Sequence, residues 1–245
     1  MLKSIKVSFV FICVIVSLLS SCKKKSSDPT PSTSGSSPVL SATQANSYFP
    51  LTTNSTWSYK GASFSYTVTV TGSTKVINGI TCYQIKELAD TSNTPTYSYV
   101  YQTGNKYYEI SYNELNVGGT PFTLKMIDLD LAVGSNWVSY DTSNQYTLVS
   151  YTGQVTGTGL TRTVNGITYN NVISVQQTTS AAFTPAYIAT LSTYLSPSEI
   201  QSLESSLSTY SASQVTYFAL GVGFIEQTST TTSALDVQLI SSSVK

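Results

Sequence analysis

Residues 64–81 read FSYTVTVTGSTKVINGIT, and this stretch decides the fold. From Phe64 to Thr71, apolar and aromatic residues alternate with Ser and Thr, which is the period-two pattern of a half-buried β-strand. Asn78 and Gly79 then stand between β-forming residues, and an Asn-Gly pair in that position is the strongest short-range signal for a two-residue hairpin turn. The stretch therefore predicts two antiparallel strands that meet at Asn78-Gly79.

Runs of the same kind continue along the chain. Residues 97–101 and 106–110 flank a turn at Gly104-Asn105, which predicts a second hairpin. Further strand-like runs follow at residues 122–129, 137–140, 146–155, 167–176, 214–220, 224–227 and 235–240. Short strands interrupted by turn residues are typical of all-β domains. We therefore predict an all-β fold in which antiparallel meanders form a curved sheet, an open barrel or a sandwich.

An internal repeat accompanies these strands. VINGIT at residues 76–81 recurs in relaxed form as TVNGIT at residues 163–168. Trp57 and Trp137 precede the two asparagines by 21 and 28 residues. Asn-Gly hairpins are common, so coincidence is the alternative, but two paired landmarks in the same order favour a repeat. We predict a single β-rich domain at residues 39–245 with related halves at about 48–118 and 119–245.

One segment, near residues 184–211, has helical rather than strand periodicity. Apolar residues recur at helical spacing both before and after residue 196. Ser196, Pro197 and Glu199 supply an N-cap, a proline at the first helical position and the acidic partner of a capping box. The segment is therefore predicted to be a helical hairpin with its break at Ser196. It can close one end of a barrel, act as a lid or, by default, cover apolar surface with its stripe.

The first 38 residues predict the cellular location of the protein rather than its fold. Lys3 and Lys6 precede a short apolar run at residues 7–19, which has the length of a signal-peptide core. The following Leu19-Ser20-Ser21-Cys22 resembles the lipobox of bacterial lipoproteins. That resemblance implies a signal peptide at residues 1–21, removed before Cys22, and acyl chains on Cys22. A plain secretory signal with a stray cysteine and an N-terminal membrane helix are the alternatives.

Residues 23–38 read KKKSSDPTPSTSGSSP and contain no apolar residue that a core could bury. We expect residues 22–38 to form the lipidated cysteine and a disordered tether. The expected location is the cell envelope, lipid-anchored, at the outer membrane.

Composition excludes several functions. Beyond Pro38 there are seven basic residues against eleven acidic ones, so no basic face is available for nucleic acid. The chain has no histidine, which removes Ser-His-Asp and Cys-His catalysis and histidine-based zinc sites. Cys82 is the one cysteine beyond the predicted signal and lipid site, and it is read as a small residue packed in a strand. No cofactor is indicated.

Two further motifs resemble a known family. Tyr48-Phe49-Pro50-Leu51, followed by Thr56-Trp57-Ser58-Tyr59, resembles the opening of uncharacterised envelope lipoproteins of Bacteroidota type, with Asn54 where a glycine is usual. Residues 133–137, VGSNW, repeat the element more faithfully, and residues 217–225, YFALGVGFI, resemble the family's C-terminal Gly-Val-Gly run. The resemblance implies an envelope β-protein and brings no catalytic residue.

Acidic residues offer two candidate chemistries. Asp128 and Asp130 stand on one face of a predicted strand and would need a third carboxylate to hold calcium. Glycosidases need only two carboxylates, so the absence of histidine does not forbid that reaction. No spacing singles out a pair among the available carboxylates, which are Glu87, Glu109, Glu114, Asp128 and Asp141.

Tyrosine is the marked excess, with eighteen in the chain. Tyr97, Tyr99 and Tyr101 share one face of a predicted strand, and Tyr107 or Tyr108 with Tyr112 are expected across from them. Such a row either stacks sugar rings or forms a cross-strand ladder that stabilises the sheet by about 0.2–1 kcal/mol per pair. The favoured hypothesis is a lipid-anchored envelope protein with a non-enzymatic binding or structural role, glycan binding included. The alternatives are a glycan hydrolase that uses paired carboxylates and a carrier of apolar ligands.

Overall fold

The computed structural model describes residues 46–111, 121–142, 144–208, 212–230 and 233–245. Within them, twelve strands form one antiparallel sheet. The strands are β1 (Thr56–Gly61), β2 (Ser65–Ile77), β3 (Ile80–Ala89), β4 (Thr96–Thr103), β5 (Lys106–Ser111), β6 (Phe122–Asp128), β7 (Asn136–Asp141), β8 (Thr147–Val164), β9 (Ile167–Phe183), β10 (Ala212–Ala219), β11 (Gly223–Ser229) and β12 (Val237–Ser243). The lipid site Cys22, the predicted signal peptide and the tether lie outside the described residues.

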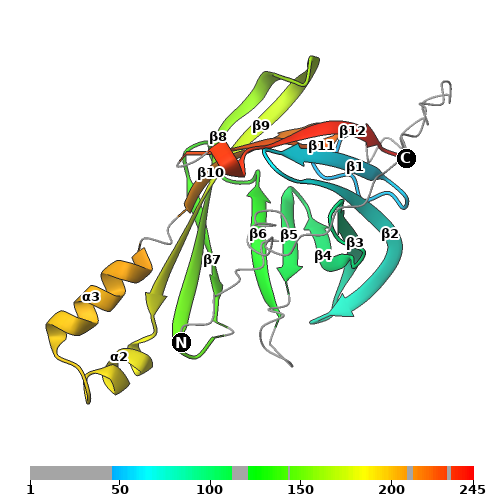
Figure 1. Cartoon of the computed structure of the whole chain (residues 1–245). Coiled ribbons are helices and arrows are strands. Elements are labelled where there is room, and N and C mark those ends of the chain that lie inside the picture. The colour runs from blue at the N-terminus through cyan, green and yellow to red at the C-terminus, as the bar shows by residue number, and fades with distance from the viewer. Residues whose placement is uncertain (1–45, 112–120, 143, 209–211, 231–232) are drawn as a thin grey trace.

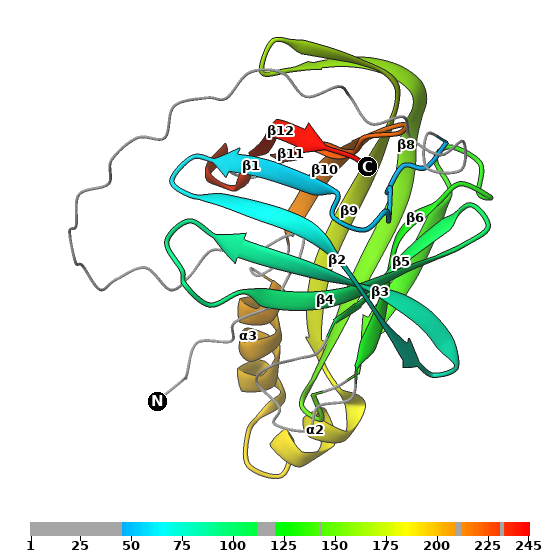
Figure 2. The same ribbon diagram turned by 90° about the vertical axis from the view of Figure 1, so that its right-hand side faces the viewer.

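The sheet curls into a nearly closed barrel, which confirms the predicted all-β fold (Figures 1 and 2). The strand order is β6-β5-β4-β3-β2-β1-β12-β11-β10-β9-β8-β7. Each strand therefore pairs with the strands before and after it in the chain, except that β6 and β7 do not pair with each other, and β1 pairs with β12. The ends of the sheet are thus two strands that follow one another in the chain. We call the boundary between β6 and β7 the seam.

Side chains bridge the seam where ladder hydrogen bonds stop. The Lys125 N–H of β6 donates to Ser139 Oγ of β7 at 3.0 Å. Trp137 Nε1 donates to the Lys125 carbonyl at 2.8 Å. Further along, the rings of Phe122 and Tyr151 stack with centroids 5.6 Å apart. Both backbone groups of Lys125 therefore have partners although β6 is a terminal strand of the sheet, and unpaired backbone groups at a sheet edge are otherwise a liability.

The repeated turns have the conformations that their residues favour. At the β2–β3 and β8–β9 turns, Asn78 and Asn165 have φ of 51° and 48°, and the glycines that follow both have φ of 79°. Positive φ at both central positions is what a type I′ hairpin turn requires, and Asn and Gly tolerate it best. The two VINGIT-like segments therefore form equivalent hairpins.

A second equivalence appears before each tryptophan. Asn54 and Gly134, three residues ahead of Trp57 and Trp137, have φ of 64° and 91°. The Asn54 N–H donates to Val70 and the Gly134 N–H donates to Val155, both at 2.9 Å. Each segment thus bonds back to its own hairpin in the same way, and Asn54 adopts the positive φ that Gly134 adopts in the second half.

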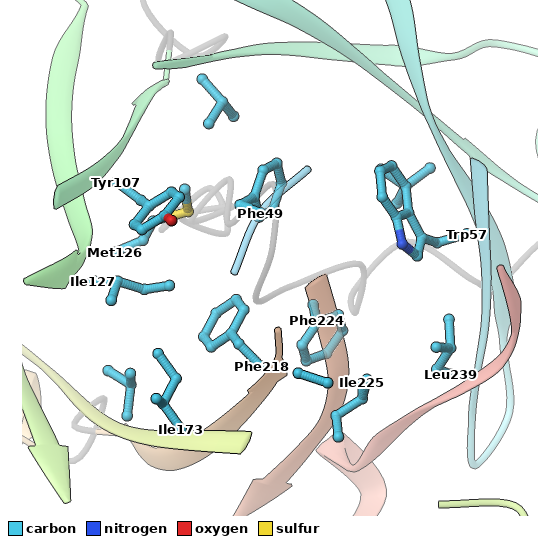
Figure 3. Close-up of a cluster of buried hydrophobic side chains, with 14 of the residues drawn as sticks. Phe49, Trp57, Tyr107, Met126, Ile127, Ile173, Phe218, Phe224, Ile225 and Leu239 are labelled. Carbon is cyan, nitrogen blue, oxygen red and sulfur yellow. The ribbon is translucent and has the colours of Figure 1, made fainter. Parts of the chain in front are cut away.

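The main core fills one end of the barrel. Residues 46–51 run across that end, and Phe49 lies between Tyr107 and Trp57 with Phe218 and Phe224 beside it (Figure 3). The Ser47 carbonyl accepts from Gly221 N–H at 2.8 Å, and Trp57 Nε1 donates to the Val222 carbonyl at 2.7 Å. The Tyr-Phe-Pro-Leu opening and the Gly-Val-Gly run are therefore in contact, and together they close this end.

The tip of the β8–β9 hairpin closes a gap between β11 and β12. These strands pair at Glu226–Gln238 and Gln227–Val237. Beyond those pairs, Asn165 Nδ2 donates to the Leu239 carbonyl at 2.6 Å, and Val164 is buried in the main core. On the outer face, Arg162 pairs with Glu226 and lies over the Tyr217 ring. β8 and β9 are longer than the sequence predicts: β8 continues to Val164 at the hairpin tip, and β9 continues to Phe183, where its last residues pair with the start of β8.

The predicted helical hairpin is present as α2 (Pro185–Leu191) and α3 (Pro197–Ser208), which project beyond the other end of the barrel (Figure 1). Ser196 caps α3 as predicted: Glu199 accepts from Ser196 N–H at 2.8 Å. The expectation that the hairpin covers apolar surface holds for α3, where Ile200 is buried; α2 fully buries none of its residues, but its Tyr187 packs against the rings of Tyr146 and Phe183. Among the described residues, no helix combines the length and apolarity needed to cross a membrane.

Candidate functional site

A buried polar group on β3, β4 and β5 interrupts the apolar interior. Glu87 pairs with Val68, Ser98 with Ile85, and Glu109 with both Val100 and Leu124. Paired residues share a face of the sheet, and these partners belong to the core or line it. Glu87, Ser98 and Glu109 therefore point into the barrel, and 5%, 0% and 2% of their surfaces are exposed.

Burial changes the acidity of both carboxyl groups. Removal from water raises the pKa of Glu87 to about 8, and the nearby Glu109 charge adds to the shift. Burial also raises the pKa of Glu109 to about 7, although the neighbouring Ser98 hydroxyl acts in the opposite direction. At neutral pH Glu87 therefore carries its proton, and Glu109 lies near the midpoint of its titration.

The facing wall of the barrel carries a second polar pair. Thr216 of β10 is directly opposite Gln227 of β11, and their other partners are the core residues Val175 and Val237. In the strand order, four strands separate β4–β5 from β10–β11 in either direction. The two groups therefore lie on opposite walls. We call Glu87, Ser98, Glu109, Thr216 and Gln227 the interior cluster.

Several atoms of the interior cluster are buried without a hydrogen-bond partner of good geometry among the described residues. They are Ser98 Oγ, Glu109 Oε1, Thr216 Oγ1 and Gln227 Oε1. Ser98 Oγ is close enough to Glu109 to influence its pKa, but the geometry is not that of a hydrogen bond. Leaving a buried polar group unpaired costs about 1–3 kcal/mol, so four in one interior are an unusual concentration.

Aromatic rings adjoin the carboxyl groups. Tyr59 and Tyr66 stack at 5.1 Å between centroids, and Phe64 continues the stack at 6.1 Å from Tyr66. Burial, with the nearby Glu87 charge as a smaller cause, raises the pKa of both tyrosines well above the usual value, so both rings stay neutral. The site therefore combines carboxyl groups, hydroxyls and aromatic faces.

The tyrosines predicted to bind ligand lie elsewhere, on the outer face of β4. Tyr101 is buried and stacks flat on Tyr108, with centroids 4.7 Å apart and an interplanar angle of 7°. Tyr99 is half-buried, and Lys75 lies 5.3 Å from its ring centroid. Tyr97 is 47% exposed. Tyr107 faces the core instead, and Tyr112 lies outside the described residues.

The other candidate acids do not form a cluster of carboxyl groups in the described residues. Asp128 pairs with Lys125 at 2.7 Å and Asp130 with Lys106 at 3.1 Å, so both face lysines. Asp141 is buried on β7 across the seam, and Glu114 lies outside the described residues. The described residues contain no cluster of three or more metal-ligating side chains. Cys82 is fully buried on β3, in a small cluster with Ile77, Tyr101 and Ile110, as expected for a packed residue.

The sequence offers Glu87 and Glu109 among several candidate acids without pairing them, and Ser98, Thr216 and Gln227 were not predicted. A polar residue on the apolar side of an alternating strand was the available signal: Glu87 follows Ile85 at spacing two, and Glu109 follows Tyr107. Which side of each strand faces the core depends on the register of all twelve strands. That information is not local.

Comparisons with known proteins add little to this geometry. No family model matches the chain, and no curated protein matches it. Among solved structures, the chain is similar to a protein from Parabacteroides distasonis that is provisionally described as a lipoprotein. The TM-score is 0.44 at 11% identity, covering 80% of this chain and 97% of the other. This likeness to a protein of Bacteroidota origin is too distant to carry an argument about the site.

Proposed function

We propose that the protein is a lipid-anchored envelope protein whose barrel is a non-enzymatic binding module for a small ligand. The observation that supports binding is the interior cluster, which places unpaired polar atoms on two facing walls of a domain that is otherwise built to exclude water. The support for anchoring is the lipobox-like Leu19-Ser20-Ser21-Cys22 after an apolar run. Outer-membrane location belongs to the same proposal.

The buried polar atoms favour binding over a purely structural role. Apolar residues of similar shape at Ser98 and Thr216 would remove a cost of about 1–3 kcal/mol per group, so a fold selected for stability alone has no reason to keep them. Buried groups that reduce stability are typical of functional sites, where a ligand supplies the missing partners.

A glycan hydrolase is the second candidate, because Glu87 and Glu109 both face the interior and the charge of Glu109 affects the pKa of Glu87. It is less well supported. Retaining and inverting glycosidases both need one ionised carboxylate beside one protonated acid, with a sugar ring between them and the solvent. Here Glu87 and Glu109 are both buried against the core, with 5% and 2% of their surfaces exposed, so neither carboxyl group is accessible to a sugar ring.

Sugar binding on the outer tyrosine row has weaker support than binding inside the barrel. A stacking platform needs exposed ring faces, and Tyr101 offers its face to Tyr108. A carrier of purely apolar ligands is also a poorer match, because the carboxyl groups would stay unpaired beside such a ligand.

Replacing Thr216 tests the binding module. Thr216→Val keeps the shape and removes the unpaired hydroxyl, so we expect it to raise the unfolding midpoint of the full-length protein in detergent. The matched control is Thr67→Val on the outer face of β2, where no comparable gain is expected. A destabilised Thr216→Val variant would mean that the hydroxyl has a structural partner, and the proposal would lose its main support.

Fractionation tests the anchor separately. Cys22→Ala removes the acceptor of the acyl chains, so the variant should move from the membrane fraction to the soluble fraction. If it still behaves as an integral membrane protein, the first residues are an uncleaved anchor and the lipid site is wrong.

A further inference from the structure

We propose that one end of the barrel rests on the lipid surface to which the chain is anchored, with aliphatic side chains of two turns in contact with the membrane. This inference rests on the lipid anchor of the proposed function and adds how the domain is oriented on that anchor. Three features carry it: the end at which the chain enters the barrel, the aliphatic side chains exposed at that end, and the polar character of the opposite end.

The chain enters the barrel beside the ends of two hairpins. The Tyr48 N–H donates to Tyr107 Oη at 3.2 Å, which places the first described residues next to the start of β5. The Leu129 N–H donates to the Asn105 carbonyl at 3.1 Å, so the connection between β6 and β7 lies against the β4–β5 turn. In Figure 2 the ends of the β2–β3 and β4–β5 hairpins lie on the same side of the molecule as the blue start of the described chain. We call these two hairpin ends, together with residues 129–135, the entry face.

The length of chain before the barrel keeps the entry face near the membrane. Residues 23–45 separate Cys22 from the first described residue, Asn46. A flexible segment of that length has a root-mean-square end-to-end distance of about 24–29 Å. The entry face is therefore the part of the domain that the anchor holds close to the lipid. A contact too weak to bind a free protein becomes effective there, because the anchor supplies a high local concentration of lipid.

Aliphatic side chains are exposed on the entry face. Val76, near the end of β2, is 67% exposed, and Val133, between β6 and β7, is 53% exposed. No other aliphatic side chain among the described residues is as exposed as these two, and Ile80 across the β2–β3 turn adds a third at 38%. Single exposed aliphatic residues are normal on a protein surface, but the two largest exposures at the end where the anchored chain enters are those of a surface that lies against lipid.

The β2–β3 hairpin end also projects from the sheet. β1 pairs with β2 only as far as Thr69, and β4 pairs with β3 only from Tyr83 onward. Residues 76–81 therefore extend beyond both neighbouring ladders. Ile77 is buried against Tyr101, which holds the hairpin end in place. A rigid projection of this kind brings its exposed aliphatic side chains to a flat surface ahead of the strands beside it.

The opposite end of the barrel is polar. The β3–β4 connection there reads DTSNTP at residues 90–95, and neither this connection nor α2 and α3 contain a basic residue. On the entry face, Lys75 is exposed and Lys106 pairs with Asp130. Lysines are attracted to anionic headgroups, whereas hydroxyl, amide and carboxyl groups favour water. The entry face is therefore the end of the domain that suits a lipid surface.

The test is iodide quenching of a bimane label on the full-length acylated protein in phosphatidylcholine vesicles. Cys82 is fully buried and Cys22 is acylated in the proposed anchor, so an introduced cysteine can be labelled by itself. Labels at Val76→Cys and Val133→Cys should be quenched about twofold or more weakly than in the matching Cys22→Ala protein, because lipid shields them. Ile167→Cys is the matched control. Ile167 follows the equivalent Asn-Gly turn and is 51% exposed, but its hairpin tip bonds to β12 and lies away from the entry face in Figure 2, so its quenching should not change.

A substitution gives a second readout. The double variant Val76→Asp with Val133→Asp places two charges on the entry face, so a label at Thr103→Cys on the β4–β5 hairpin end should regain the quenching of the unanchored protein. Both valines are exposed, so neither charge is buried in the fold. Ile167→Asp is the matched control, and the label at position 103 should stay shielded in it.

Three outcomes would overturn the inference. Equal quenching of the labels at positions 76, 133 and 167 in membrane-bound protein would show that the anchored domain has no preferred orientation, which leaves the anchor intact. Shielding of positions 76 and 133 that rises with protein concentration in the absence of vesicles would show that a second copy, and not lipid, covers the entry face. Failure of the parent protein to fractionate with membranes would overturn the anchor, and the orientation would fail with it.

Discussion

At the scale of single residues, the same dipeptide performs two tasks in this barrel. Asn78-Gly79 and Asn165-Gly166 form turns of matching φ. Asn78 is exposed at a hairpin end, whereas Asn165 also donates a side-chain hydrogen bond that closes the gap beside β12. The turn conformation is thus local and can be predicted from the sequence. The additional contact of Asn165 depends instead on the packing of the hairpin tip against β12.

The exposed turn allows a clean test of backbone strain. A Cβ built on Gly79 has no atom within 4 Å, so a substitution there creates no clash. Gly79→Val should still lower stability by about 1–2 kcal/mol, because a β-branched residue resists positive φ. Urea unfolding measures the loss. Gly79→Asn is the control and should cost less, and an unchanged midpoint for the valine variant would contradict the turn assignment.

The two buried glutamates predict how stability changes with pH. Their pKa values in the folded protein, about 8 and about 7, lie above the ordinary value of 4.5, so the folded state holds protons that the unfolded state releases. Their contribution is therefore complete below about pH 4.5 and is lost as pH rises through 7 and 8. The expected slope approaches about 1.4 kcal/mol per pH unit for each proton.

Glutamine variants isolate this effect from other titrations. Glu87→Gln and Glu109→Gln resemble the protonated side chain, so each should match the parent near pH 5 and exceed its stability at pH 8. The measurement is the difference in denaturation midpoint between variant and parent across that range. If the difference does not change with pH, the carboxyl groups do not have raised pKa values in the folded state.

At the scale of secondary-structure elements, pairs of strands decide which side chains become sites. The sequence predicts the hairpin turns at Asn78-Gly79 and Gly104-Asn105, the repeat of the first at Asn165-Gly166 and the position of α3, because alternation, turn residues and capping boxes are local. It does not predict that Glu87 and Glu109 point inward while Tyr97, Tyr99 and Tyr101 point outward. All five residues lie on convincing strands, and only the register across β2 to β6 assigns their faces.

The outer tyrosine row separates a packed ladder from a ligand platform. Tyr101 is buried against Tyr108, so Tyr101→Ser should cost about 3–5 kcal/mol, as truncation of a buried aromatic typically does. Tyr97 is 47% exposed, and Tyr97→Ser should change the melting temperature little. Retention of the parent on polysaccharide columns is the companion measurement. Retention that Tyr97→Ser and Tyr99→Ser abolish without loss of stability would support a glycan platform instead.

At the scale of the whole molecule, twelve strands form a nearly closed barrel in which strands that follow one another in the chain are neighbours. The two six-strand runs, β1–β6 and β7–β12, meet at β1–β12 through ladder hydrogen bonds and at the seam through side chains. The sequence repeat predicts two similar runs, but not their joining. Trp57 and Trp137 show the difference: both donate an indole hydrogen bond, one to the Gly-Val-Gly turn and the other to β6 across the seam.

The seam makes a prediction about cooperativity. Trp137→Phe removes the hydrogen bond to the part-buried Lys125 carbonyl but keeps an aromatic ring, and the lost bond should cost about 0.5–1.5 kcal/mol. Trp57→Phe is the matched control, since it loses an equivalent bond to Val222 at the closed end. Hydrogen exchange locates the effect: β6 and β7 should exchange faster in the Trp137 variant, while the control should affect β1 and the β10–β11 turn. If both variants instead accelerate exchange uniformly, the barrel opens only by global unfolding, and the seam is as strong as the ladders that flank it.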